Sequence, residues 1–151
     1  MPEVQRRATV PLRLAQVWPY VADMNRWAAD VPGYRAHRML SERESVWRLT
    51  GDMGMLSREV EVNVLITEWR EPSHVAFTLH GLEEPVTGEG TFSMEQVNDE
   101  NTSLSFSLTL TAAGSLAPVI NVLLKTFMAR VADQFIETLR ERLLAQAQGS
   151  A

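Results

Sequence analysis

The chain has 151 residues, of which 45% are hydrophobic and 22% are charged, so it is long enough to bury a core of its own. Its formal net charge of −5 argues against a broad nucleic-acid-binding face. The sequence contains no cysteine, which excludes disulfides, thiolate metal sites and cysteine nucleophiles. Because no repeat or linker-like segment interrupts it, we expect one domain over residues 1–148 and a short tail over residues 149–151.

The first quarter of the chain predicts one strand and two short helices. Apolar and polar residues alternate over residues 4–10, which is typical of a strand. A helix is predicted over residues 14–23. A second short helix begins at Asn25, a candidate N-cap, and ends at Pro32-Gly33. These two helices are too short to form a core and are expected to connect larger elements.

From residue 34 the pattern changes to the period of two that strands show. The last strand is the clearest, because four apolar residues alternate strictly with Ser and Thr. Short turns between consecutive strands predict an antiparallel sheet with one apolar face. Six strands are predicted, over residues 34–40, 44–52, 56–69, 74–82, 86–97 and 104–110.

The last long stretch, residues 115–146, predicts one amphipathic helix about 45 Å long. Its apolar residues recur at steps of three and four and form a single stripe. Such a helix must bury this stripe, and the apolar face of the sheet is the surface available to it. The stripe consists of Leu116, Ile120, Leu123, Leu124, Phe127, Met128, Val131, Phe135 and Leu139.

A curved sheet does not have to lie flat against a helix, so an apolar cavity between them is one expectation and a solid core is the other. Arg58 shares the parity of the inward valines on its strand, so it could hold a carboxylate, phenolate or quinone oxygen at the mouth of a cavity. The alternative is an arginine at the rim of the sheet whose charged end reaches solvent. The predicted cavity lining is Trp47, Leu49, Arg58, Val62, Phe77, Leu79, Phe92, Met94, Phe106, Leu108, Leu124, Phe127, Met128 and Val131.

Candidate catalytic residues are few. An inward acid or base would come from Arg58, Glu89 or Tyr34, and no strong pair exists among them. His37, His74 and His80 lie on separate segments without metal-ligand spacing, so we interpret all three as surface residues and expect no metal and no cofactor.

The sequence resembles the helix-grip superfamily (SRPBCC/START), which includes START lipid-transfer domains, the birch pollen allergen family and polyketide cyclase/dehydrase-like proteins. The resemblance rests on the order of the elements and on the runs VWPYVAD (17–23) and VPGY (31–34). Within the superfamily the chain looks most like the G-subunit family of carbon monoxide dehydrogenase, through GEGT (88–91) and ADQFIETL (132–139). This implies an α+β helix-grip fold, in which a curved antiparallel sheet of about seven strands wraps around the long C-terminal helix.

The resemblance also implies a function. Members of the G-subunit family resemble accessory factors of molybdenum hydroxylases that act at the membrane. We therefore expect a protein that binds a small hydrophobic ligand such as a lipid, a quinone or an aromatic, with an oxidoreductase partner. The N-terminal MPEVQRRATV lacks the apolar stretch of a signal peptide, so we expect a cytoplasmic protein. The resemblance implies that it makes peripheral contact with the inner face of the membrane. A polyketide cyclase/dehydratase-like enzyme and a ligand-free interaction module are the alternatives.

Overall fold

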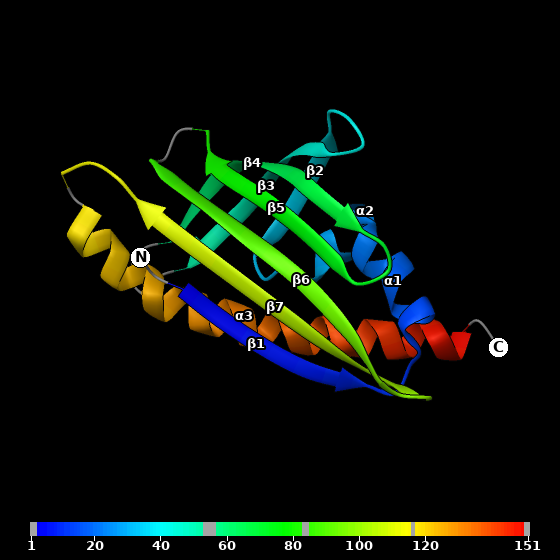
Figure 1. Cartoon of the computed structure of the whole chain (residues 1–151). Helices are drawn as coiled ribbons and strands as arrows, with labels where there is room; N and C mark the ends of the chain where they lie inside the picture. The colour runs from blue at the N-terminus through cyan, green and yellow to red at the C-terminus, as the bar shows by residue number, and fades with distance from the viewer. Residues whose placement is uncertain (1–2, 53–56, 83–84, 116, 150–151) are drawn as a thin grey trace.

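The computed structural model describes residues 3–52, 57–82, 85–115 and 117–149, with the backbone alone for residues 51, 52, 57, 58, 123 and 147–149. Strand β1 comes first and is followed by short helices and then by six more strands and a long helix (Figure 1). In chain order the elements are β1 (Glu3–Val10), α1 (Leu14–Ala22), α2 (Met24–Trp27), the 3-10 helix η1 (Ala28–Asp30), β2 (Tyr34–Met39), β3 (Glu44–Asp52), β4 (Ser57–Arg70), β5 (His74–Gly81), β6 (Val86–Asn98), β7 (Asn101–Ala112) and α3 (Ala117–Gly149).

The seven strands form one antiparallel sheet in the order β1-β7-β6-β5-β4-β3-β2. The first strand pairs with the last one, so β1 and β2 are the two edges of the sheet. The sheet curves, and α3 runs along its concave side (Figure 1). The predicted α+β arrangement of a curved sheet and a long C-terminal helix is therefore confirmed.

Strand β7 shows how alternation directs side chains to the two faces of the sheet. Leu104, Phe106 and Leu110 are buried, whereas the serines between them are only half-buried. The strand is longer than predicted and includes Thr102, whose buried hydroxyl donates a hydrogen bond of 2.7 Å to the carbonyl of Leu12. This bond fixes the end of β7 to the segment that leads into α1.

Helix α3 has 33 residues, which corresponds to a length of about 50 Å. It begins at Ala117, two residues later than predicted. Leu124, Met128 and Phe135 are buried by the sheet, and Leu139 and Leu143 continue the same stripe. No helix in the described part of the chain is long and apolar enough to cross a membrane.

The short helices are anchored by Trp27, the last residue of α2. Its ring contacts Trp47 and Phe77 of the sheet at centroid distances of 5.5 Å and 5.9 Å, and Phe92 at 5.1 Å. It also contacts Phe135 of α3 at 6.0 Å. One indole therefore joins the connecting helices, the sheet and the long helix in a single core.

Candidate functional site

A cavity of about 460 Å³ lies between the concave face of the sheet and the N-terminal half of α3. The walls are apolar: among the described residues that line it, none is titratable, and Thr50 supplies the only hydroxyl group. The predicted lining residues that border it are Trp47, Leu49, Val62, Phe77, Leu79, Phe106, Leu108, Leu124, Phe127 and Val131.

Three of the predicted lining residues lie elsewhere. Phe92, Met94 and Met128 are buried in solid core and do not appear in the cavity wall. The ring of Phe92 is surrounded by aromatic neighbours, with Phe106 at 5.2 Å and Phe135 at 5.9 Å between centroids. Alternation gave the correct face for these residues but not their position along it, because the gap is confined to one end of the sheet. The side chain of Arg58 lies outside the described residues.

Several lining residues were not in the predicted set. Val60 and Val64 have the parity of Val62, so the sequence carried the signal for them. Trp27 and Val31 come from the segment of short helices, for which strand alternation gives no information. Thr50 also belongs to the wall, and its hydroxyl accepts a hydrogen bond of 3.0 Å from Arg35 Nε.

A second, more open hollow of about 520 Å³ adjoins the cavity. The two share Pro32, Thr50, Phe127 and Val131 as common walls. The remaining walls of this hollow, which we call the mouth, are mostly polar: Gly33, Tyr34, Arg35, Arg130 and Gln134. An apolar chamber therefore lies beside a polar mouth, an arrangement that suits a ligand with an apolar body and a polar end.

The mouth depends on an unusual backbone conformation at the start of β2. Gly33 has φ of +84°, and a Cβ there would lie 2.2 Å from the carbonyl oxygen of Thr50. Only glycine allows this approach, and the Thr50 N–H donates a hydrogen bond of 2.8 Å to the Gly33 carbonyl. Gly33 thereby sets where β2 meets β3 and where Tyr34 lies.

An irregularity in β2 changes the expected faces of its side chains. The register with β3 shifts between Tyr34 and Ala36, which brings His37 directly opposite Trp47. His37 was interpreted as a surface residue, and this is wrong. It is half-buried beside Trp47, with ring centroids 6.1 Å apart. The irregularity at the start of β2 thus brings the His37 ring to the side of the sheet that carries Trp47.

The other candidate polar residues do not reach the cavity. His80 is exposed, and His74 is half-buried with Nδ1 3.0 Å from Ser93 Oγ on the neighbouring strand. Glu89 is exposed on β6. Within the described ranges, no group of three or more His, Asp or Glu side chains could hold a metal ion.

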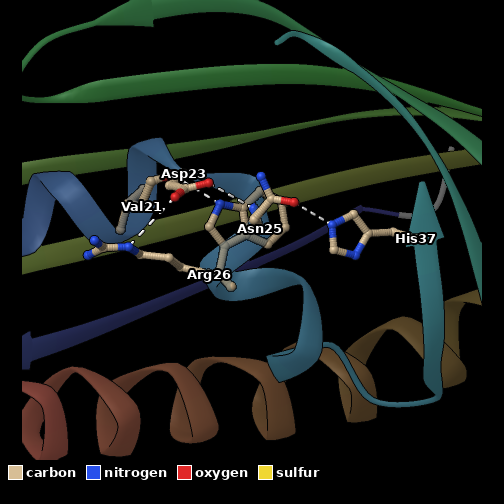
Figure 2. Close-up of polar contacts among 6 residues, drawn as sticks. Val21, Asp23, Asn25, Arg26 and His37 are labelled. Carbon is tan, nitrogen blue, oxygen red and sulfur yellow. Dashed lines mark hydrogen bonds and ion pairs between the residues drawn. The ribbon is translucent and has the colours of Figure 1, made fainter. Parts of the chain in front are cut away.

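His37 belongs to a chain of hydrogen bonds at the mouth. Its Nδ1 lies 2.6 Å from the Tyr34 hydroxyl, and its Nε2 lies 2.6 Å from Asn25 Oδ1. Figure 2 shows His37 directed from β2 toward Asn25 on α2. The chain therefore connects a residue of the mouth to the short helices.

A separate buried polar cluster lies outside the cavity wall. The Tyr20 hydroxyl donates a hydrogen bond of 2.5 Å to Asp30 Oδ2, and Arg142 Nε lies 2.9 Å from Asp30 Oδ1. Burial raises the pKa of the Asp30 carboxyl, although Tyr20 and Arg142 act in the opposite direction. Burial, followed by the bond to Asp30, raises the pKa of the Tyr20 hydroxyl. This cluster joins α1, η1 and the C-terminal half of α3.

A curved antiparallel sheet around a long helix, with an apolar cavity between them, defines the START-like helix-grip class. Solved structures with this fold include a conserved protein from Geobacillus kaustophilus, with 16% identity, coverage of 95% of both chains and a TM-score of 0.81. A START superfamily protein from Mycobacterium smegmatis shares 13% identity over 95% of this chain and 98% of its own, with a TM-score of 0.75. The Zhui aromatase/cyclase from a Streptomyces species shares 18% identity over 96% and 94% of the two chains, with a TM-score of 0.73.

Residues 1–144 match the family described as "Polyketide cyclase / dehydrase and lipid transport", and the chain belongs to this family. No curated protein matches the chain by sequence.

Proposed function

We propose that the protein binds one small hydrophobic molecule in the cavity between the sheet and α3. The observation that carries the proposal is a space of about 460 Å³ whose described walls contain no titratable side chain. Ligand sites usually have volumes of roughly 300–1,000 Å³ and are mainly apolar. Burial of apolar surface contributes about 25 cal/mol per Å², so a lipid, quinone or aromatic molecule gains most of its affinity from the walls.

Native mass spectrometry of the purified protein, followed by organic extraction, tests this function. We expect either a retained hydrophobic molecule at a ratio of one to one, or an empty protein that binds an apolar fluorescent dye. A series of lipids, quinones and polycyclic aromatics should then displace the dye competitively. A folded protein that neither retains a molecule nor takes up the dye would contradict the proposal.

An enzyme that acts on a polyketide-like substrate is the second candidate. Support for it comes from the family, whose description includes cyclases and dehydrases, and from the Tyr34–His37 hydrogen bond at the mouth. Such an enzyme needs an acid or base next to the substrate, and the described cavity walls offer none. Turnover of an aromatic polyketide analogue that stops in Tyr34→Phe would favour this candidate over simple binding. A ligand-free interaction module with a filled core has less support, because the cavity is large.

The narrower assignment to the G-subunit family of carbon monoxide dehydrogenase stays a prediction. It would make the protein an accessory factor for a molybdenum hydroxylase, with contact to the inner face of the membrane. Co-purification of the tagged chain with a molybdenum-containing enzyme, verified by metal analysis of the complex, tests the partnership. Sedimentation with anionic vesicles tests the membrane contact separately.

A further inference from the structure

The hydrogen bonds around His37 define which of its ring nitrogens carries a proton. The Asn25 side-chain oxygen can only accept, so His37 Nε2, at 2.6 Å from it, is the donor. In the neutral imidazole, Nδ1 is then an acceptor, and the Tyr34 hydroxyl at 2.6 Å donates to it. The Tyr34 proton is therefore directed at His37, and the phenol oxygen has its lone pairs to offer elsewhere.

The position of Asn25 is itself fixed by several contacts in α2. The Asp23 side chain caps this short helix by accepting a hydrogen bond of 3.0 Å from the Asn25 backbone N–H, so Asn25 is not the N-cap that its sequence context suggested. Asp23 also lies 3.6 Å from Arg26, and the Trp27 indole donates to the Val21 carbonyl at 3.0 Å. Figure 2 shows these contacts around Asn25, with His37 reaching it from β2. The acceptor for His37 therefore belongs to a short helix that is capped by Asp23 and tied to Val21 through Trp27.

Tyr34 lies where a ligand in the cavity would present its polar end. It lines the mouth, which shares the walls Thr50, Phe127 and Val131 with the apolar chamber. Its ring stands edge-on to Trp47 at a centroid distance of 6.2 Å, and Trp47 lines the chamber. Tyr34 therefore borders a hollow that lies directly beside the apolar chamber.

We propose that His37 and Asn25 orient Tyr34 as a hydrogen-bond acceptor for a ligand that carries a hydroxyl or N–H group on an apolar body. The inference rests on the proposed binding function and specifies its ligand class: phenols, hydroquinones and apolar alcohols bind in preference to the same molecules with the donor methylated. Tyr34 makes the contact, and His37 and Asn25 are positioning residues that act through it.

A matched pair of ligands tests the contact: 2-naphthol, which has a hydroxyl donor, and 2-methoxynaphthalene, which has none. We expect the protein to bind 2-naphthol about fivefold more tightly, the difference that a typical net hydrogen-bond contribution produces. In Tyr34→Phe this preference should disappear, while the affinity for 2-methoxynaphthalene stays unchanged. Tyr20→Phe is the matched control, because it removes the other tyrosine hydroxyl of the chain and should keep the preference.

The tautomer of the His37 ring is a separate readout for the positioning role of His37 and Asn25. A merely structural contact at Asn25 would not change this tautomer. Nitrogen NMR of the labelled His37 ring should show a protonated Nε2 and an unprotonated Nδ1. In Asn25→Leu, the ring should become a mixture of both tautomers, and the preference for 2-naphthol should fall. Asn25→Gln keeps a side-chain amide oxygen, so it should partly restore both the Nε2-protonated tautomer and the preference for 2-naphthol.

The outcomes separate the two proposals. If neither naphthalene compound binds to the folded protein, the cavity function fails and this inference fails with it. If both bind with equal affinity, or if Tyr34→Phe keeps the preference for 2-naphthol, the cavity function stands and the role of Tyr34 is overturned. A His37 ring protonated on Nδ1 alone would also overturn the inference.

Discussion

The aromatic ring of Phe77 lies against the backbone of Gly90 on the neighbouring strand, its direct partner in the β5–β6 register. A Cβ at Gly90 would stand 2.4 Å from Phe77 Cζ, so an alanine there must displace the ring. Because Phe77 also lines the cavity, Gly90→Ala should both strain the core and alter the site. We expect the free energy of unfolding to fall by about 1–3 kcal/mol in urea titrations, together with weaker dye binding.

Glu89→Ala is the control for this change, since Glu89 is the exposed neighbour of Gly90 on the same strand. It should leave the free energy of unfolding within about 0.5 kcal/mol of the native value. Equal stability of Gly90→Ala and Glu89→Ala would show that the ring can move without cost.

The wall that the cavity shares with the mouth offers a test of binding. Phe127 is half-buried there, so Phe127→Asp places a carboxylate in contact with any apolar ligand. We expect the folded variant to lose dye binding and retained ligand, because burying an unpaired charge is unfavourable. Val122→Asp puts the same charge on the same helix at a position that is 70% exposed, and it should bind like the native protein. Retention of ligand by Phe127→Asp would argue against the cavity.

The buried carboxyl of Asp30 predicts a pH effect. Its pKa is raised from the ordinary value of 3.8, mainly by burial, so the folded state binds a proton more readily than the unfolded state. Between the ordinary and the raised pKa, stability must therefore fall as the pH rises. Asp30→Asn should remove this contribution, so the native protein should lose stability relative to the variant as the pH rises through this interval.

Urea unfolding of the native protein and of Asp30→Asn at a series of pH values measures this difference. Tyr20→Phe is an informative companion, because the Tyr20 hydroxyl bond lowers the pKa of Asp30. Loss of this hydrogen bond should raise the pKa of Asp30 further, so the interval over which stability falls with rising pH should extend to higher pH. Parallel stability curves for the native protein and Asp30→Asn would contradict the expectation.

Thr102 and Leu12 predict a second effect on stability. The Thr102 side chain is fully buried, and its hydroxyl satisfies the Leu12 carbonyl at 2.7 Å. Thr102→Val preserves the shape but leaves that carbonyl without its donor, and should lower the free energy of unfolding by about 1–3 kcal/mol. Thr78→Val, at an exposed position of β5, is the matched control and should have little effect. The melting temperatures of the two variants provide the comparison.

Much of the fold could be predicted from sequence because its strands alternate strictly. The strand over residues 44–52 has the predicted bounds, and the other predicted strands differ at their ends by a few residues. Strand β2 is the exception, because alternation does not predict which way its side chains point. Its register shift places His37 beside Trp47, and no alternation pattern reveals an extra residue in advance. Gly33, with its positive φ, was visible in the sequence only as part of a turn.

The site was less predictable than the fold. Periodicity gives the face on which Val62 or Phe92 lies, but whether that face meets a cavity or solid packing depends on the distance of α3 from the sheet. Hydrogen bonds among Tyr34, His37 and Asn25 join α2 to the edge strand β2. His37 and Asn25 are 12 residues apart in the sequence, so only folding brings their side chains together. Motif spacing gave no sign of these contacts.

The two halves of α3 border different surroundings, and this has a consequence for motion. Ile120 and Phe127, near its start, are only half-buried beside the cavity, whereas Leu139 and Leu143, farther along, are fully buried and do not line it. Local unfolding free energy follows the density of buried contacts, so amide hydrogens in the early turns of α3 should exchange with solvent sooner than those in the late turns. The early turns of α3 would then open for exchange of the ligand, while the densely packed late turns keep the protein folded.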